Sequence, residues 1–265
     1  MTEPSPTNED RQAAYDAQAP EAPPRTPEEH RVHSRRSMLV GGAAIAVGAL
    51  GFRWVQKQPL DNRIPGPLRS SHERNEALWS RLFREDHLAP TFDASESSVL
   101  RVNGRKGLES DIDLDSWELL VRNHQGTEID RLGLDDIKAL PMHEMTIEHK
   151  CVEGWSQVTT WGGARFSDFA AAYEPNLSRS YVGLVTPDRG YYAGLDMATM
   201  LHPQTLLVYE MMGQALDLAH GAPLRLATPL KYGIKQLKRI GSIQFTDDKP
   251  DDYWFERGYD YYSGL

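Results

Sequence analysis

One long run of uncharged residues near the start of the chain constrains its architecture most. Residues 37–52 carry no charge and are rich in Gly and Ala. A membrane-spanning helix needs about 20 apolar residues, so this run reaches that length only if Trp54 and Lys57 extend it as an interfacial anchor. The run divides the chain into a leader at 1–33, an apolar segment at 34–58 and a folded region at 59–265.

A pair of arginines, Arg35 and Arg36, stands just before the apolar run. Paired arginines ahead of a modest apolar segment have the order of a twin-arginine export signal, a route that carries proteins already folded. An ordinary signal anchor or a short buried helix is the alternative. No clear Ala-x-Ala cleavage site follows, so segment 34–58 is either a cleaved twin-arginine signal or an uncleaved N-terminal membrane anchor. In both cases we expect the folded region in the periplasm or outside the cell.

Composition limits what the other two parts can be. Residues 1–33 are dominated by Pro, Glu, Ala and Thr, which predicts a disordered cytoplasmic leader. The roughly 200 residues from position 59 suffice for one substantial domain. The net charge of -9 and the lack of a basic stripe argue against nucleic-acid binding. A local cluster of cations can still bind an anion.

The folded region is predicted to hold short strands and few helices. Its order lacks the regular strand–helix alternation of a doubly wound fold, so we predict a mixed α+β fold with mostly antiparallel or mixed sheets. Strands are expected at 98–102, 117–121, 145–149, 181–185, 205–211, 214–218, 224–227 and 240–246, and helices at 134–140, 165–173 and 195–201.

Cys151 is the single cysteine of the chain. A lone thiol forms no intramolecular disulfide, so its role is packing, reactivity or metal ligation. It follows a predicted strand and precedes Gly154, and a soft thiolate where a strand gives way to a loop suits a heavy metal. Two other interpretations stay open. Cys151 is either a buried small hydrophobe or the nucleophile of a hydrolase with His143 or His149 as base.

Cations gather later in this acidic chain. His220 and Arg225 flank a turn, and residues 229–239 are rich in Lys and Arg. Gly233 allows a close backbone approach to an anion, while Arg and Lys side chains bind phosphate. The alternative is a solvated strand edge that discourages aggregation. Taken with Cys151, the cluster predicts a phosphate-bearing cofactor.

Three segments carry a family resemblance: residues 151–156, 220–225 and 231–235. They resemble the molybdopterin-binding oxidoreductases of the sulfite oxidase superfamily. Within it, the exported branch similar to the catalytic subunit of the bacterial periplasmic methionine sulfoxide reductase is most alike. The resemblance runs from about Leu82 to Ile243 and implies a mixed-sheet sulfite-oxidase-type fold with Mo-molybdopterin as cofactor.

The resemblance also implies roles for particular residues. Cys151 matches the thiolate that ligates molybdenum, and His220 follows the sulfite oxidase pattern where the sulfoxide reductase branch has asparagine. Glu85 and Asp86 depart from the family pattern, which has Arg and Asn at these positions. The implied cofactor contacts are Phe83, Arg84, His87, Cys151, Thr186, His220, Arg225, Gly233, Ile234 and Lys235.

The surroundings of Cys151 bear on the substrate. Sulfite-oxidising members of the superfamily place arginines soon after the cysteine, whereas this chain has Glu153 there, which would repel a dianion. We therefore expect a small neutral oxo donor or acceptor such as a sulfoxide, with Glu153 donating a proton or binding substrate; a structural salt bridge is its alternative role. Sulfite oxidation, aided by Lys150 or Arg165, and a metal-free exported binding module remain alternatives.

Aromatic residues and the electron supply complete the sequence predictions. The chain has no haem Cys-x-x-Cys-His motif. We therefore expect a separate redox partner, a membrane b-type cytochrome. Residues expected to wall the pocket are Trp155, Trp161 and Tyr192. An aromatic tail that either covers the site entrance or docks a partner comprises Tyr253, Trp254, Tyr259, Tyr261 and Tyr262.

Overall fold

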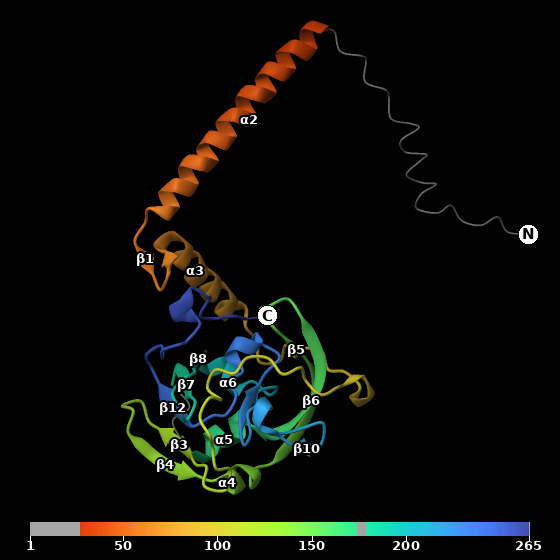
Figure 1. The fold of residues 1–265 in the computed structure, drawn as a ribbon, viewed down its shortest axis with the longest axis vertical. Helices are drawn as coiled ribbons and strands as arrows, with labels where there is room; N and C mark the ends of the chain where they lie inside the picture. The colour runs from red at the N-terminus through yellow and green to blue at the C-terminus, as the bar shows by residue number, and fades with distance from the viewer. Residues whose placement is uncertain (1–26, 174–178, 265) are drawn as a thin grey trace, which may run out of the picture. The chain divides into compact units, whose positions relative to one another are not determined.

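The computed structural model describes residues 27–173 and 179–264. The chain forms two compact units, Met1–Lys57 and Gln58–Leu265, which are described separately. In the first unit the helix α2 (Pro27–Gln56) includes the apolar run (Figure 1). Its part Ser34–Gln56 is long and apolar enough to cross a membrane, a test that a signal sequence near the N-terminus also passes.

Helix α2 begins earlier than the sequence analysis expected. Residues 27–33 of the predicted disordered leader are helical. Proline is tolerated in the first helical turn, and the Glu and Arg residues that follow it are good helix formers. Residues 1–26, the rest of the predicted leader, lie outside the described residues.

The second unit begins with a small hairpin and a helix that the sequence analysis did not predict. Strands β1 (Leu60–Asp61) and β2 (Ile64–Pro65) pair antiparallel, and α3 (Gly66–Leu82) follows directly. Most of α3 is exposed to solvent, and Arg69 is its one buried residue.

Two five-stranded sheets form the body of this unit (Figure 1). The first is antiparallel throughout; its β5–β6 hairpin, paired from Met142↔Ala164 to Lys150↔Ser156, closes at the loop that contains Cys151. The first sheet comprises β10 (Gln214–Ala215), β9 (Leu206–Met211), β6 (Ser156–Arg165), β5 (Met142–Lys150) and β11 (Arg225–Ala227), the last paired with β9.

The second sheet is mixed. Its strands β3 and β12 run parallel, and the other pairs are antiparallel. The predicted mixed α+β class is therefore confirmed. In order, the strands are β4 (Glu128–Leu132), β3 (Leu119–Arg122), β12 (Ser242–Thr246), β7 (Tyr181–Val185) and β8 (Tyr192–Asp196).

Short helices and apolar side chains join the two sheets. The larger cluster of buried apolar residues takes side chains from both sheets and from α5, whose Phe166, Phe169 and Ala170 are fully buried as predicted. Phe169 lies against Phe245 of β12, with ring centroids 6.5 Å apart. The short α-helices are α4 (Leu134–Lys138), α5 (Phe166–Tyr173) and α6 (Met197–Leu201), and 3-10 turns lie at Ala94–Glu96, Leu218–His220, Gly233–Lys235 and Phe255–Arg257.

The predicted strand at 98–102 is wrong. The segment runs beside β6, but the Arg101 amide bonds to the Gln157 side-chain oxygen at 2.9 Å, and the Ser98 amide bonds to the Val158 carbonyl at 3.1 Å. A side-chain amide thus replaces a backbone partner, and no ladder forms. This irregular segment leads into the site.

Candidate functional site

The loop between β5 and β6 places Cys151 at a cavity of about 200 Å³. The loop is tight, because the Cys151 amide bonds to the Trp155 carbonyl at 2.9 Å and the Gly154 amide bonds to the Cys151 carbonyl at 3.1 Å. Gly154 has φ 87, a conformation that favours glycine. Cys151 is 9% exposed, and its thiol lies at the cavity wall rather than deep in the core.

Asn103 and Glu153 flank the thiol. The Asn103 Nδ2 atom lies 3.6 Å from Cys151 Sγ and 3.2 Å from Glu153 Oε2, and Trp155 Nε1 donates to the same oxygen at 3.1 Å. Two donors thus hold the Glu153 carboxylate at the cavity. The sequence analysis missed Asn103. The Asn-Gly pair that it forms with Gly104, between Arg101 and Lys106, was the available signal.

A buried guanidinium faces the same cavity. Arg225 is 1% exposed, donates from Nη1 to the His220 carbonyl at 3.0 Å, and lies 4.5 Å from the Trp161 ring centroid. Among the described residues it forms no ion pair with a carboxylate, and burial lowers its pKa to about 10. A buried cation without an anionic partner is costly, so this position favours a bound anion.

Lys238 adds a second cation at this cavity. Its ammonium donates to the carbonyls of Asn103 at 2.7 Å and Ala219 at 3.0 Å. Burial, reinforced by Arg225, lowers its pKa to about 8. Two cations facing one cavity suit the phosphate of a cofactor, since Arg and Lys bind phosphate by charge-assisted hydrogen bonds.

His149 closes the inner wall of the cavity next to Gly233. Its Nδ1 atom lies 3.1 Å from Gln236 Oε1, and a Cβ atom at position 233 would lie 2.7 Å from His149 Nε2. Glycine at 233 therefore lets the loop backbone pack directly on the imidazole. Burial, with Arg225 adding to it, lowers the pKa of His149 to about 4, so the ring is neutral at pH 7.

The low pKa of His149 predicts a loss of stability in acid. The unfolded chain binds this proton near pH 6.5, whereas the folded ring binds it near pH 4. The contribution is therefore present above pH 6.5 and is lost as the pH falls. We expect His149 to lower the free energy of unfolding by about 2 kcal/mol between pH 7 and pH 5. Urea titrations at both pH values would show a smaller pH dependence in His149→Gln, and an equal dependence would contradict the assignment.

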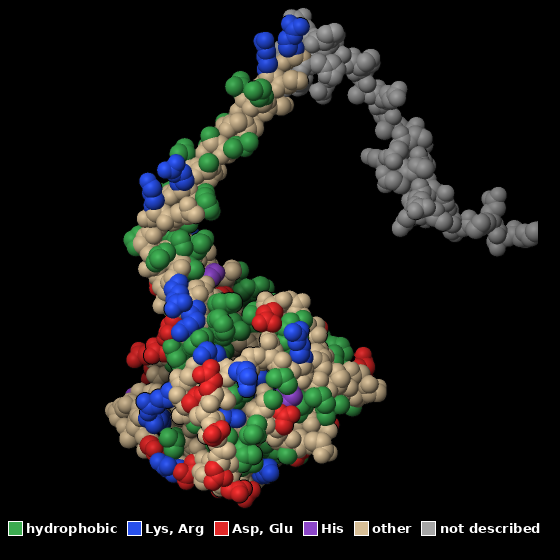
Figure 2. Space-filling view, in the orientation of Figure 1, with side chains coloured by type: hydrophobic (Ala, Val, Ile, Leu, Met, Phe, Trp, Pro, Cys, Tyr) green, Lys and Arg blue, Asp and Glu red, His purple; other side chains and the backbone are tan. Residues whose placement is uncertain are grey.

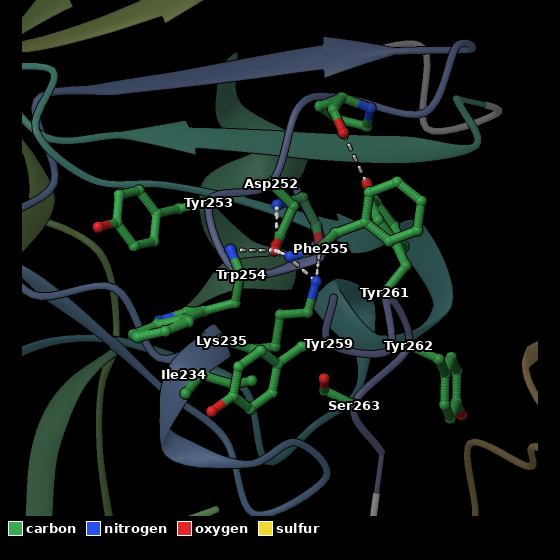
Figure 3. A network of polar contacts seen from close by, with 12 residues as sticks. Ile234, Lys235, Asp252, Tyr253, Trp254, Phe255, Tyr259, Tyr261, Tyr262 and Ser263 are labelled. Carbon is green, nitrogen blue, oxygen red and sulfur yellow. Dashed lines mark hydrogen bonds and ion pairs between the residues drawn. The ribbon is translucent and has the colours of Figure 1, made fainter. Parts of the chain in front are cut away.

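The structure gathers five of the predicted site residues at this cavity: Cys151, Glu153, Arg225, Gly233 and Ile234. Lys235 points away from it, because its ammonium donates to Asp252 Oδ2 at 2.6 Å and to the Gly194 carbonyl at 2.9 Å (Figure 3). The Lys235 side chain is therefore not available to the cavity. A cofactor contact of Lys235 stays a prediction, and it would have to come from the backbone of this residue.

Two further predicted contacts lie just behind the cavity wall. His220 is buried, with Nδ1 2.8 Å from Asp217 Oδ1 and Nε2 2.6 Å from the carbonyl of Leu100, which itself lines the cavity. Thr186 donates to Asp188 and opens on a separate groove. Both residues are linked to the cavity through neighbours, and their contact with the cofactor stays a prediction.

The segment that holds Phe83, Arg84 and His87, predicted to contact the cofactor, does not line the cavity. Phe83 packs edge-on against His202 at 5.9 Å, and Arg84 forms an exposed ion pair with Asp86 at 2.8 Å. His87 is also exposed. None of the three lines the cavity, whereas residues between Leu100 and Gly104 do.

The predicted aromatic walls are partly found. Of the predicted wall residues, Trp155 lines the cavity, and of the predicted aromatic tail, Trp254 and Tyr259 line it. Trp161 is fully buried behind Arg225, and Tyr192 instead bonds to Glu256 at 2.5 Å. The cavity-lining tyrosine is its neighbour Tyr191, whose hydroxyl donates to the Ile234 carbonyl. The sequence analysis thus chose the wrong member of the Tyr191–Tyr192 pair.

Neither hydrolase base is bonded to the thiol. Among the described residues, His143 pairs with Asp168 at 3.4 Å and His149 with Gln236, and no hydrogen bond joins either ring to Cys151. The described residues also hold no group of three or more His, Cys, Asp or Glu side chains that could bind a metal ion. Cys151 thus offers one thiolate, which suits a metal whose other ligands belong to a cofactor.

A lone thiol and buried cations at one cavity suit a metal cofactor that carries a phosphate, as in the molybdenum-cofactor oxidoreductases. Residues 106–254 match the family model described as the oxidoreductase molybdopterin binding domain. The chain belongs to this family. It is a molybdenum-dependent enzyme, and its cofactor is Mo-molybdopterin, as the sequence predicted.

The chain is similar to several known proteins. A protein of Azospira oryzae named as the protein-methionine-sulfoxide reductase subunit YedZ1 is 32% identical over 88% of this chain and 87% of its own length. The protein-methionine-sulfoxide reductase catalytic subunit MsrP of Ralstonia nicotianae is 37% identical over 46% of this chain and 41% of its own. The crystal structure of the sulfane dehydrogenase SoxCD from Paracoccus pantotrophus covers 53% of this chain and 40% of its own, with 14% identity and a TM-score of 0.48.

Proposed function

We propose that this protein reduces a sulfoxide, with the sulfoxide of methionine as the substrate class. The observation that carries the proposal is Glu153, held beside Cys151 at the cavity. A carboxylate at this position repels the sulfite dianion and tolerates a neutral sulfoxide. The names of the relatives from Azospira oryzae and Ralstonia nicotianae agree with this choice.

The residues of the cavity have separate roles in holding the cofactor and in transferring protons. When bound, the cofactor supplies the two-electron change and accepts the oxo group. Cys151 would hold its metal, and Arg225, Lys238 and the Gly233 backbone would hold its phosphate-bearing part. Reduction of a sulfoxide to a thioether and water consumes two protons and two electrons. Glu153 is the acidic side chain that lines the cavity among the described residues. Its carboxylate would take up each of the two protons from solvent in turn and pass it to the departing oxygen.

Sulfite oxidation is the second candidate, and one observation favours it. Arg101 and Lys106 line the same cavity and could offset the charge of Glu153. The rescuing cations expected from the sequence do not line it: Lys150 pairs with Glu148 at 3.5 Å, and Arg165 lies at the other end of the β5–β6 hairpin. Lys106 is itself paired with Glu109 at 3.0 Å, which weakens its hold on a dianion.

The proposal also covers where the enzyme is located and which protein supplies its electrons. Arg35 and Arg36 lie within the apolar span Ser34–Gln56, directly before its uncharged run at 37–52, and support export by the twin-arginine route. The folded unit would then lie in the periplasm or outside the cell. A two-electron enzyme without a haem motif needs an electron donor. We propose a membrane b-type cytochrome, in keeping with the word "subunit" in the names of the relatives.

A comparison of two assays distinguishes the two reactions. The cofactor-loaded enzyme should oxidise reduced benzyl viologen with methyl phenyl sulfoxide at least about tenfold faster, in kcat/KM, than it reduces ferricyanide with sulfite; a tenfold ratio corresponds to about 1.4 kcal/mol. The reverse ratio would make the enzyme a sulfite dehydrogenase.

A further inference from the structure

Arg69 is the one buried residue of α3, a helix that is mostly exposed to solvent. Its side chain is 1% exposed, and its guanidinium donates from Nη1 to the Tyr259 carbonyl at 2.9 Å and from Nη2 to the Phe255 carbonyl at 3.0 Å. The guanidinium also lies 3.9 Å from the Phe255 ring centroid. Its nearest carboxylate, on the exposed Asp61, is 4.0 Å away. A planar fork with several donors suits two carbonyls and an aromatic face at once, which a lysine could not match.

The two carbonyls belong to a loop that forms one wall of the cavity. Trp254 and Tyr259 both line the cavity that contains Cys151, and their ring centroids are 5.0 Å apart. The Tyr259 amide bonds to the Trp254 carbonyl at 3.0 Å, which closes the loop. Figure 3 shows Tyr259 and Trp254 beside Ile234, another residue of the cavity wall.

The start of this loop is fixed by Asp252, which is paired with Lys235. Asp252 is 2% exposed; its Oδ2 accepts from Lys235, and its Oδ1 accepts from the Trp254 amide at 3.1 Å and the Phe255 amide at 2.9 Å (Figure 3). Lys235 directly follows Ile234. The Lys235–Asp252 pair therefore fixes Trp254, whereas the far end of the loop, at Tyr259, is held by Arg69.

We propose that Arg69 is a positioning residue for the active site, which makes α3 part of the catalytic unit. Because Arg69 fixes the Phe255 and Tyr259 carbonyls, it sets where the Tyr259 ring stands in the cavity. Rings at this wall face whatever occupies the space beside the thiol, and a displacement of about 1 Å in such a wall can lower a rate markedly. This inference rests on the proposed function in one respect: the sulfoxide used as substrate in its test.

Arg69→Met tests the proposal, because methionine fills much of the volume without the donors. We expect faster amide hydrogen exchange in residues 255–259, together with a KM for methyl phenyl sulfoxide about tenfold higher and a smaller change in kcat. Molybdenum content per chain should stay equal to that of the wild type. Arg74→Met, the same substitution at an exposed position of α3, should match the wild type in all three measurements.

If Arg69→Met is recovered only as aggregate, the same measurements are made on Arg69→Lys. It keeps the charge but has one nitrogen for two carbonyls, so its KM should lie between those of the wild type and Arg69→Met. Equal exchange in the Arg69 and Arg74 variants, or a loosened loop with an unchanged KM, would overturn the proposal. If the wild type reduced no sulfoxide, the proposed function would fail, and the exchange result would still decide whether Arg69 positions the loop.

Discussion

Replacing Cys151 with serine is expected to lower turnover by at least about 100-fold, because removing even an outer partner of a metal ligand typically costs 10–100-fold. Serine keeps the size of the side chain and the backbone bonds of the loop. It replaces a thiol that ionises to an electron-rich thiolate with a hydroxyl that stays protonated near neutral pH, so the metal loses its anionic sulfur ligand. Because the phosphate-binding cations remain, the variant should retain a substantial part of its pterin.

Three measurements on the Cys151→Ser protein separate these effects: dye-linked sulfoxide reduction, molybdenum by elemental analysis, and pterin by fluorescence after oxidation. The thermal midpoint should stay within a few degrees of the cofactor-free wild type, since the exchanged atom lies at a cavity wall. A serine variant with near-normal turnover would mean that Cys151 is the buried small hydrophobe of the alternative interpretation.

Arg225→Met is expected to have the opposite pattern: loss of pterin with little loss of apoprotein stability. Arg225 is fully buried and has no carboxylate partner among the described residues, so its desolvation cost is offset chiefly when an anion binds. We expect the cofactor content to fall at least about tenfold, because the variant loses its charge-assisted hydrogen bonds to the phosphate.

The stability of the cofactor-free Arg225→Met protein separates a role in cofactor binding from a purely structural role. The variant loses the hydrogen bond to the His220 carbonyl, a cost of about 1 kcal/mol, but it is relieved of a buried charge. Its free energy of unfolding in urea should therefore change by no more than about 2 kcal/mol. Arg131→Met, at an exposed arginine of β4, is the control and should retain full cofactor content. A strongly destabilised Arg225 apoprotein would indicate a purely structural guanidinium.

Local patterns made much of the fold predictable. Helix α5 was predicted because Phe166, Phe169 and Ala170 recur at helical spacing, and all three are buried. Strand β7 ends where Thr186-Pro187 stops it, as expected. Cys151 was equally accessible to local reasoning, because a strand, a turn glycine and the thiol are neighbours in sequence.

Contacts between distant segments were not predictable in this way. The Arg69 side chain meets Tyr259 across 190 positions, and the Asn103 side chain meets Cys151 across 48. Lys235 illustrates the same limit: its cluster of cations predicted a phosphate contact, but Asp252 takes its ammonium. The sequence alone does not say which carboxylate, if any, the fold brings to a given buried cation.

X-ray absorption at the molybdenum edge tests the central claim most directly, because it counts the sulfur atoms bound to the metal. The wild-type protein, purified from cells supplied with molybdate, should contain about one molybdenum per chain, the stoichiometry of one thiolate and one cofactor site. Its spectrum should show one more sulfur neighbour than that of Cys151→Ser. Equal sulfur counts in the two proteins would contradict the assignment of Cys151 as the ligand.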